Sequence, residues 1–309
     1  MPILLLSPGR KLDRWTEALR KTDPAVPVFL PEDKVPERDI SFILAWDHPR
    51  GCFVRYPGLR CISSFGAGVD HLVSDREIPE NVRLVRIIDP ALSNDMLEFT
   101  LAVIMKHLRK LNIYNSYKTE VKWKKHGYRR IRETGVGIMG TGVIGHHVAD
   151  GLSRIGFDVS GWSRTMGGKA SYRKFHGVEQ LNEFLSRCEI LVCLLPLTDE
   201  TRGIIDYHLL KSLPGDAYLV NLGRGAHIVE ADLFRALDKG LISGAHLDVF
   251  ESEPLFEAHP FWKNSKIDIT PHVASLTDPL SVAPQIMENY HLVMQGREPK
   301  NQVSRSRGY

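Results

Sequence analysis

The stretch Gly135-Val-Gly-Ile-Met-Gly140-Thr-Gly-Val-Ile-Gly145 decides how this chain folds. It opens with a short apolar run, residues 136–139, of the kind that forms a buried parallel strand. Three glycines in the spacing GxGxxG follow at once, and an amphipathic helical pattern begins behind them. A glycine turn between a strand and a helix is typical of dinucleotide-binding folds, because backbone N–H groups at the helix N-terminus can then receive a pyrophosphate.

The surrounding sequence repeats this alternation of strand and helix. Behind the glycine turn, apolar runs predict further strands at residues 157–162, 190–194, 218–222, 244–249 and 267–269. Earlier in the chain, strands are expected at residues 3–6, 42–46, 60–63 and 84–87. A long helix is expected from near Asn94, and a last one over residues 281–295. The pattern predicts an α/β protein with doubly wound parallel sheets, organised as two Rossmann-like domains.

Composition places the chain among ordinary globular proteins. Of its 309 residues, 43% are hydrophobic and 25% charged, which excludes global disorder. Forty basic and 37 acidic residues leave a net charge of +3, too small for a nucleic-acid partner bound by overall charge. Residues 109–132 carry nine basic side chains, for which a solvated helix face and a charged loop are expected rather than a nucleic-acid patch.

Membrane, secretory and metal-binding features are not expected. The longest apolar run, residues 190–195, is far too short to span a bilayer, and the N-terminal residues lack the basic region of a signal peptide. The four cysteines form no CxxC pair, so reduced thiols in a cytoplasmic protein are predicted.

The residues after the second strand of this domain indicate which dinucleotide is bound. An acidic residue there favours NAD, since it accepts a hydrogen bond from the ribose 2′-hydroxyl, whereas a cation favours NADP. Residues 157–162 are followed by Ser163 and Arg164, while Asp158 stands at the opposite end of the strand. NADP(H) is therefore the predicted cofactor.

Three polar side chains follow three further strands of the same domain. Arg224 follows residues 218–222, Glu253 follows residues 244–249, and His272 follows residues 267–269. The carboxyl ends of parallel strands meet at one edge of the sheet, beside the nucleotide. The spacing thus predicts a permanent cation, a carboxylate and an imidazole along one rim, which is an acid–base group.

With these motifs, the chain resembles the D-isomer-specific 2-hydroxyacid dehydrogenase family, and within it the NADPH-dependent glyoxylate/hydroxypyruvate reductase branch. The resemblance is carried by residues 64–71 (SFGAGVDH), the Gly140 turn, residues 162–164 (WSR), residues 195–198, the Arg224, Glu253 and His272 segments, and the ending RSRGY at 305–309. One departure, Asn94-Asp-Met-Leu-Glu98, replaces the family's usual small residues and glutamine near the nicotinamide.

The resemblance implies an enzyme that reduces small 2-keto acids with NADPH in a cleft between two domains, acting as a homodimer. The change of pattern along the chain sets the expected bounds, residues 1–100 and 282–309 for the substrate-binding domain and residues 101–281 for the NADP-binding domain. The resemblance implies that the last helix returns to the first domain. Arg224 would hold and polarise the substrate, His272 would donate a proton, and Glu253 would position the imidazole and keep it charged.

The remaining implied contacts are with substrate or cofactor. The Ala67 and Gly68 amides would receive the carboxylate, Ser275 would lie near substrate, and Trp46 would be a pocket wall or an ordinary core residue. The cofactor residues, which also include His272, are Gly140, Thr141, Gly142, Val143, Ile144, Ser163, Arg164, Leu195, Pro196, Thr201, Leu222, Gly223 and Asp248.

Two other functions fit the same motifs. A dinucleotide-sensing corepressor can retain the Arg, Glu and His set on this scaffold, although the chain shows no peptide-docking extension. An NAD-dependent D-lactate or phosphoglycerate type of dehydrogenase is the alternative within enzymes, and Ser163-Arg164 disfavours it. Turnover of glyoxylate with NADPH discriminates among the three.

Overall fold

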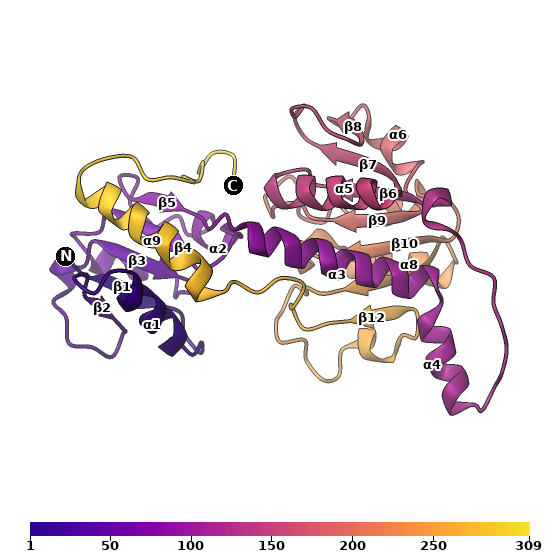
Figure 1. The fold of residues 1–309 in the computed structure, drawn as a ribbon, viewed down its shortest axis with the longest axis horizontal. Helices are drawn as coiled ribbons and strands as arrows, with labels where there is room; N and C mark the ends of the chain where they lie inside the picture. The colour runs from indigo at the N-terminus through magenta and orange to yellow at the C-terminus, as the bar shows by residue number, and fades with distance from the viewer. The chain divides into compact units, whose positions relative to one another are not determined.

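Two parallel sheets, each in its own unit, organise the chain (Figure 1). The computed structural model describes residues 1–309. One unit comprises Met1–Ala91 and Thr277–Tyr309, and the other Leu92–Leu276. The prediction of two α/β domains built on parallel sheets is confirmed.

Five short strands form the sheet of the first unit, in the order β2-β1-β3-β4-β5. They are β1 (Ile3–Leu6), β2 (Val28–Phe29), β3 (Phe42–Ala45), β4 (Cys61–Ser64) and β5 (Arg83–Val85). Every residue of β1, β3 and β4 is buried, as expected for parallel strands covered on both faces.

The helices of this unit come from both ends of the chain. They are α1 (Asp13–Thr22), α2 (Asp70–Val73) and α9 (Pro279–Met294), with single 3-10 turns at Glu37–Asp39 and Cys52–Arg55. Helix α9 packs beside α1 (Figure 1). Its Tyr290 ring meets Phe42 edge-on at 5.9 Å, and its hydroxyl donates to the Met1 carbonyl at 2.5 Å.

Seven parallel strands form the sheet of the second unit, in the order β12-β11-β10-β9-β6-β7-β8. In chain order they are β6 (Gly135–Met139), β7 (Asp158–Ser163), β8 (Arg173–His176), β9 (Ile190–Cys193), β10 (Ala217–Asn221), β11 (Ile242–Leu247) and β12 (Ile267–Ile269). The order reverses between β6 and β9, and this is the point where an open α/β sheet holds its ligand.

Helices cover both faces of this sheet. They are α3 (Pro90–Leu108), α5 (Val143–Ile155), α6 (Leu181–Leu185), α7 (Tyr207–Lys211) and α8 (Glu230–Asp238), with 3-10 turns at Ile131–Glu133, Gly225–His227 and Pro260–Lys263. Helix α4 (Leu111–Thr119) has no buried residue and projects away from the sheet (Figure 1). Alternate residues of β9 serve two hydrophobic cores: Ile190 and Val192 face one, and Leu191 and Cys193 face the other. This alternation explains the uninterrupted apolar runs in the sequence.

The structure corrects the expected elements at three places. Strands β2 and β8 were not predicted, because β2 is only two residues long and β8 has a single buried residue, Phe175. The long helix begins at Pro90 rather than near Asn94, since the Asp89 carboxylate accepts from the Ala91 amide at 3.0 Å and caps it. The charged segment does form a helix, α4, followed by a loop.

Two predictions about the whole chain can be compared with the structure directly. No helix is long and apolar enough to cross a bilayer. All four cysteines are free thiols, and three of them, Cys61, Cys188 and Cys193, are buried.

Candidate active site

The glycine turn joins β6 to α5 in the geometry that a dinucleotide phosphate needs. Gly140 has a φ of +107°, and a Cβ there would lie 2.7 Å from the Leu194 carbonyl carbon. A Cβ on Gly145 would lie 1.8 Å from the Gly140 carbonyl oxygen, so both positions require glycine. Gly142 differs, because a Cβ there would point into open space. That open cradle at the start of α5 fits a pyrophosphate.

Arg164 follows the end of β7, as the sequence predicted, but its guanidinium is already paired. Its Nη1 forms an ion pair with the Glu200 carboxylate. The side chains of Arg164 and Glu200 remain 43% and 64% exposed, so the pair is a surface one that a phosphate could replace. Ser163 lies beside it with its hydroxyl donating to the Thr165 carbonyl at 2.8 Å.

The loop after β10 holds Arg224 through buried polar side chains. Asn221, fully buried, donates from Nδ2 to the Arg224 carbonyl at 2.9 Å and accepts from the Gly223 amide at 3.2 Å. The Arg224 amide donates to His227 Nδ1 at 3.1 Å, and the ring of His227 is buried. A Cβ on Gly225 would lie 1.8 Å from the Phe250 carbonyl carbon, so glycine allows this loop to meet the segment that carries Glu253.

Glu253 and His272 form a direct hydrogen-bonded pair, with 2.7 Å between Glu253 Oε2 and His272 Nδ1. The other carboxylate oxygen of Glu253 accepts from the Phe250 amide at 2.9 Å. Burial by itself raises the pKa of Glu253, but these hydrogen bonds and the charges of His272 and Arg224 outweigh it, and the pKa lies below its usual value. The carboxylate is therefore ionised at neutral pH and lies within electrostatic reach of Arg224.

Asp248 braces the loop that carries His272. Its buried carboxylate accepts from the Thr270 hydroxyl at 2.6 Å, the Val273 amide at 2.9 Å and the Ala274 amide at 3.0 Å. Its carbonyl accepts from the His272 amide at 2.7 Å. These bonds hold His272 at a φ of +53°, a left-handed conformation that non-glycine residues rarely adopt.

Other predicted residues of this unit shape the same edge of the sheet. Leu195 and Leu222 are buried, and the Thr201 hydroxyl donates to the Pro196 carbonyl at 2.7 Å. The Ser275 hydroxyl donates to the Leu92 carbonyl at 3.0 Å, so it is engaged by the backbone. Thr141 and Ile144 are half-buried and Val143 is exposed at the start of α5.

In the first unit, the loop after β4 presents two backbone N–H groups without a partner. The Ser64 hydroxyl donates to the Gly68 carbonyl at 2.7 Å and accepts from the Gly66 amide at 3.2 Å. This leaves the half-exposed Ala67 and Gly68 amides with no acceptor in the chain, as an anion-binding nest requires. Trp46, after β3, is half-buried rather than a core residue, with its ring centroid 4.6 Å from that of His71.

Sequence reasoning missed several supporting residues, of which Asn221 and His227 fix Arg224 directly. The sequence did contain a feature that could have identified them, because both residues stand in or beside the loop that follows a buried strand. Their burial and hydrogen-bond partners depend on the folded loop, however, which the sequence does not show.

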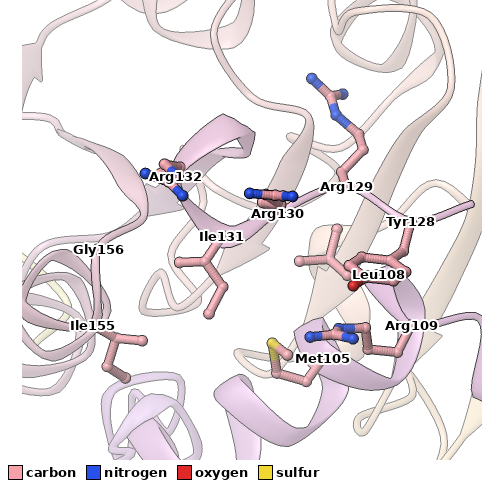
Figure 2. Close-up of a pocket in the computed structure, with 10 residues that line it drawn as sticks. All are labelled: Met105, Leu108, Arg109, Tyr128, Arg129, Arg130, Ile131, Arg132, Ile155 and Gly156. Atoms are coloured by element: carbon pink, nitrogen blue, oxygen red, sulfur yellow. The ribbon is translucent and has the colours of Figure 1, made fainter.

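A cavity of about 440 Å³ lies elsewhere in the second unit, walled by arginines over an apolar floor (Figure 2). It is lined by Met105, Leu108, Arg109, Tyr128, Arg129, Arg130, Ile131, Arg132, Ile155 and Gly156. These residues precede β6 and β7, so the cavity is at the amino ends of the strands. Arg224, Glu253 and His272 are at the carboxyl ends, so this cavity is not the candidate active site.

A nucleotide-type glycine turn and an Arg–Glu–His group on one edge of a parallel sheet are typical of nicotinamide-dependent dehydrogenases. Residues 101–274 match the family model described as D-isomer specific 2-hydroxyacid dehydrogenase, NAD binding domain. The chain belongs to this family, and the resemblance found in the sequence is confirmed.

Full-length relatives agree with this assignment. The chain is 36% identical to a glyoxylate/hydroxypyruvate reductase A of Escherichia fergusonii, with all of both chains covered. A D-isomer specific 2-hydroxyacid dehydrogenase from Xanthobacter autotrophicus, solved with NADPH and MES, superposes with a TM-score of 0.94 at 37% identity, covering 100% of this chain and 99% of that one. An NADPH-dependent glyoxylate/hydroxypyruvate reductase from Sinorhizobium meliloti, solved with NADP and sulfate, superposes with a TM-score of 0.93 at 31% identity, and both chains are fully covered.

Proposed function

We propose that this protein is an NADPH-dependent reductase of small 2-keto acids, with glyoxylate and hydroxypyruvate as its substrates. The observation that carries the proposal is the 2.7 Å hydrogen bond between Glu253 and His272, within electrostatic reach of Arg224. The names of the E. fergusonii and S. meliloti relatives support the same reaction.

The protein's residues divide the chemistry as follows. NADPH, when bound, supplies the hydride that reduces C2 of the keto acid. His272 gives a proton to the C2 oxygen from Nε2, because Nδ1 is held by Glu253. Glu253 fixes the orientation of the ring through its hydrogen bond to Nδ1, while Arg224 binds the substrate carboxylate and polarises the carbonyl. The Ala67 and Gly68 amides receive the same carboxylate.

The cofactor would be held by the glycine turn and the strand ends around it. Gly140, Gly142 and the first turn of α5 fit the pyrophosphate, because only Gly142 opens onto free space. Ser163 and Arg164 would bind the 2′-phosphate, with Arg164 exchanging Glu200 for the ligand. The segments 195–201 and 222–223 would line the nicotinamide side, with Asp248 acting through the His272 loop that it braces.

The proposed division of labour gives the first domain the substrate and the second the cofactor. We further propose a cytoplasmic homodimer. The free, mostly buried thiols support a reducing compartment. The loop after α4 supports association, because Val121 and Trp123 are 94% and 95% exposed and an apolar surface of this kind marks a contact site. Light scattering after gel filtration measures the oligomeric state.

Steady-state turnover tests the proposed reaction. Consumption of NADPH is followed by its absorbance with glyoxylate and with hydroxypyruvate, and again with NADH. His272→Ala should lower kcat by about 10²–10⁴-fold, the usual contribution of acid–base catalysis, while retaining NADPH binding by fluorescence. Binding of NADPH without turnover of either keto acid would support the corepressor alternative, and a preference for NADH would support the NAD-dependent one.

A further inference from the structure

A tight turn after β1 places Arg10 at the carboxyl edge of the first sheet. Gly9 has a φ of +76°, the left-handed conformation that suits glycine, and the Arg10 amide donates to the Ser7 carbonyl at 3.3 Å. The same edge carries Trp46 after β3 and the Ala67–Gly68 nest after β4. Pro8 and Gly9 therefore direct Arg10 toward the substrate-binding elements of this unit.

The guanidinium of Arg10 packs against two aromatic rings. Its Cζ lies 5.5 Å from the Trp46 ring centroid and 5.4 Å from that of Phe65. Phe65 is fully buried and is itself fixed by an edge-on contact with Trp15 at 4.7 Å. Aromatic packing of this kind holds a guanidinium in place through its faces and leaves the N–H groups at its edge available.

No acceptor in the protein uses those N–H groups. Arg14 and Arg20 of the same unit differ, since Arg14 pairs with Asp278 at 3.3 Å and Arg20 donates to the Val28 carbonyl at 2.9 Å. The guanidinium of Arg10 makes no hydrogen bond or ion pair. Asp47 is its one carboxylate neighbour, and the partial burial of Arg10 outweighs the charge of Asp47, so that the arginine's pKa lies below its usual value. Arg10 is exposed overall, so a ligand can reach its guanidinium, and a cation preorganised by aromatic packing suits a planar anionic ligand.

Trp46 connects Arg10 to the nest. A Cβ on Gly66 would lie 3.4 Å from Cζ3 of the Trp46 ring, and the Arg10 guanidinium packs on the same ring. One indole therefore contacts both the loop proposed to hold the C1 carboxylate and a second anion receptor. This suits a substrate with two carboxylates separated by a short chain.

We propose that Arg10 binds the distal carboxylate of a 2-oxo dicarboxylic acid, which makes such diacids substrates of this enzyme. The inference rests on the proposed function. C2 of the diacid gains the hydride of NADPH and its oxygen gains the proton of His272. The keto group becomes a hydroxyl group, NADPH becomes NADP⁺, and the distal carboxylate is unchanged.

Oxaloacetate and pyruvate form a matched pair of probes, since only oxaloacetate has the second carboxylate. The wild type should have the higher kcat/KM for oxaloacetate. Arg10→Gln should lower the ratio of the two kcat/KM values about 10- to 150-fold, the range for losing a hydrogen bond to a charged group. Arg10→Lys, which keeps the positive charge but not the paired N–H donors of the guanidinium, should lower this ratio less. Lys11→Gln, which removes the neighbouring exposed charge, should leave the ratio unchanged. A ratio unaltered by Arg10→Gln would overturn the proposal.

A binding experiment separates failure of this inference from failure of the proposed function. Calorimetric titration of D-malate and D-lactate into the protein with NADPH compares the same two end groups without turnover, because hydroxy acid and NADPH are both in the reduced state and cannot react with each other. If Arg10 acts as proposed, the wild type prefers D-malate and Arg10→Gln loses that preference, even if no keto acid is reduced. Equal affinities for the two acids in the wild type, or equal losses for both in Arg10→Gln, would refute the role of Arg10.

Discussion

Replacing Glu200 by glutamine should tighten NADPH binding and leave NADH binding unchanged. Arg164 cannot meet the 2′-phosphate with its full fork while it pairs with Glu200. Both side chains are largely exposed, and an exposed ion pair stabilises by about 0–1 kcal/mol. Releasing Arg164 therefore tightens NADPH binding by up to about 5-fold. NADH lacks the phosphate and gains nothing.

Removing Arg164 should reduce the affinity for NADPH. Arg164→Ala should weaken NADPH about 10- to 150-fold, corresponding to about 1.5–3 kcal/mol for a hydrogen bond to a charged group. In that background Glu200→Gln should have no further effect, since the only residue it releases is absent. The four proteins therefore form a double-mutant cycle whose coupling energy measures the competition between Glu200 and the phosphate.

Fluorescence titration with NADPH and NADH provides the assay. Asp199→Asn is the matched control, because it removes the adjacent exposed carboxylate and keeps the ion pair between Arg164 and Glu200. The reasoning is refuted if Glu200→Gln tightens NADH equally, or if its effect persists without Arg164. Either result would mean that only the general charge of this surface had changed.

Three further predictions follow from the site geometry. Gly142→Ala should change the free energy of unfolding by less than about 0.5 kcal/mol but weaken the binding of NADPH. Gly145→Ala should lower the free energy of unfolding by about 1–3 kcal/mol, because its Cβ meets a backbone oxygen. Urea unfolding measures the stabilities, and fluorescence titration measures NADPH binding. Asp248→Asn should lower the free energy of unfolding by about 1.5–3 kcal/mol, since an amide cannot accept all three hydrogen bonds. It should also lower kcat, because the His272 loop is held less firmly. A normal kcat would exclude the bracing role of Asp248. The lowered pKa of Glu253 means that its stabilising contribution is complete above the unfolded value of about 4.3 and is lost only as pH falls through the lower folded value. Urea unfolding at several pH values measures the stability difference between wild type and Glu253→Gln. This difference should stay constant down to about pH 4.3 and then shrink. A difference that shrinks already between pH 7 and 5 would contradict the prediction.

Sequence was sufficient for most of the sheet because buried parallel strands must be apolar throughout. The run at residues 190–194 is visible for this reason, and its strand ends within one residue of the prediction. Strand β8 escaped because it lies at the sheet edge, with Phe175 alone buried. An edge strand of this kind is fixed by backbone pairing with β7, which leaves no hydrophobic pattern in the sequence.

The sequence also determined which side chains reach the carboxyl edge of the second sheet. Arg224, Glu253 and His272 follow strands of one parallel sheet, and parallel strands end on the same side, so their grouping needed no coordinates. The GxGxxG spacing likewise specified a turn in which Gly140 and Gly145 have to be glycine.

Only the tertiary structure decided how each of these groups is held and what competes for it. The pairing of Arg164 with Glu200, the bracing of the His272 loop by Asp248 and the packing of Arg10 on Trp46 and Phe65 each join residues from different strand ends or loops. Hydrogen bonds and ion pairs act over about 3–4 Å, and loop conformations set those distances. Residue type and spacing specify the strands that bring such groups to one edge, whereas the folded loops select which of them touch.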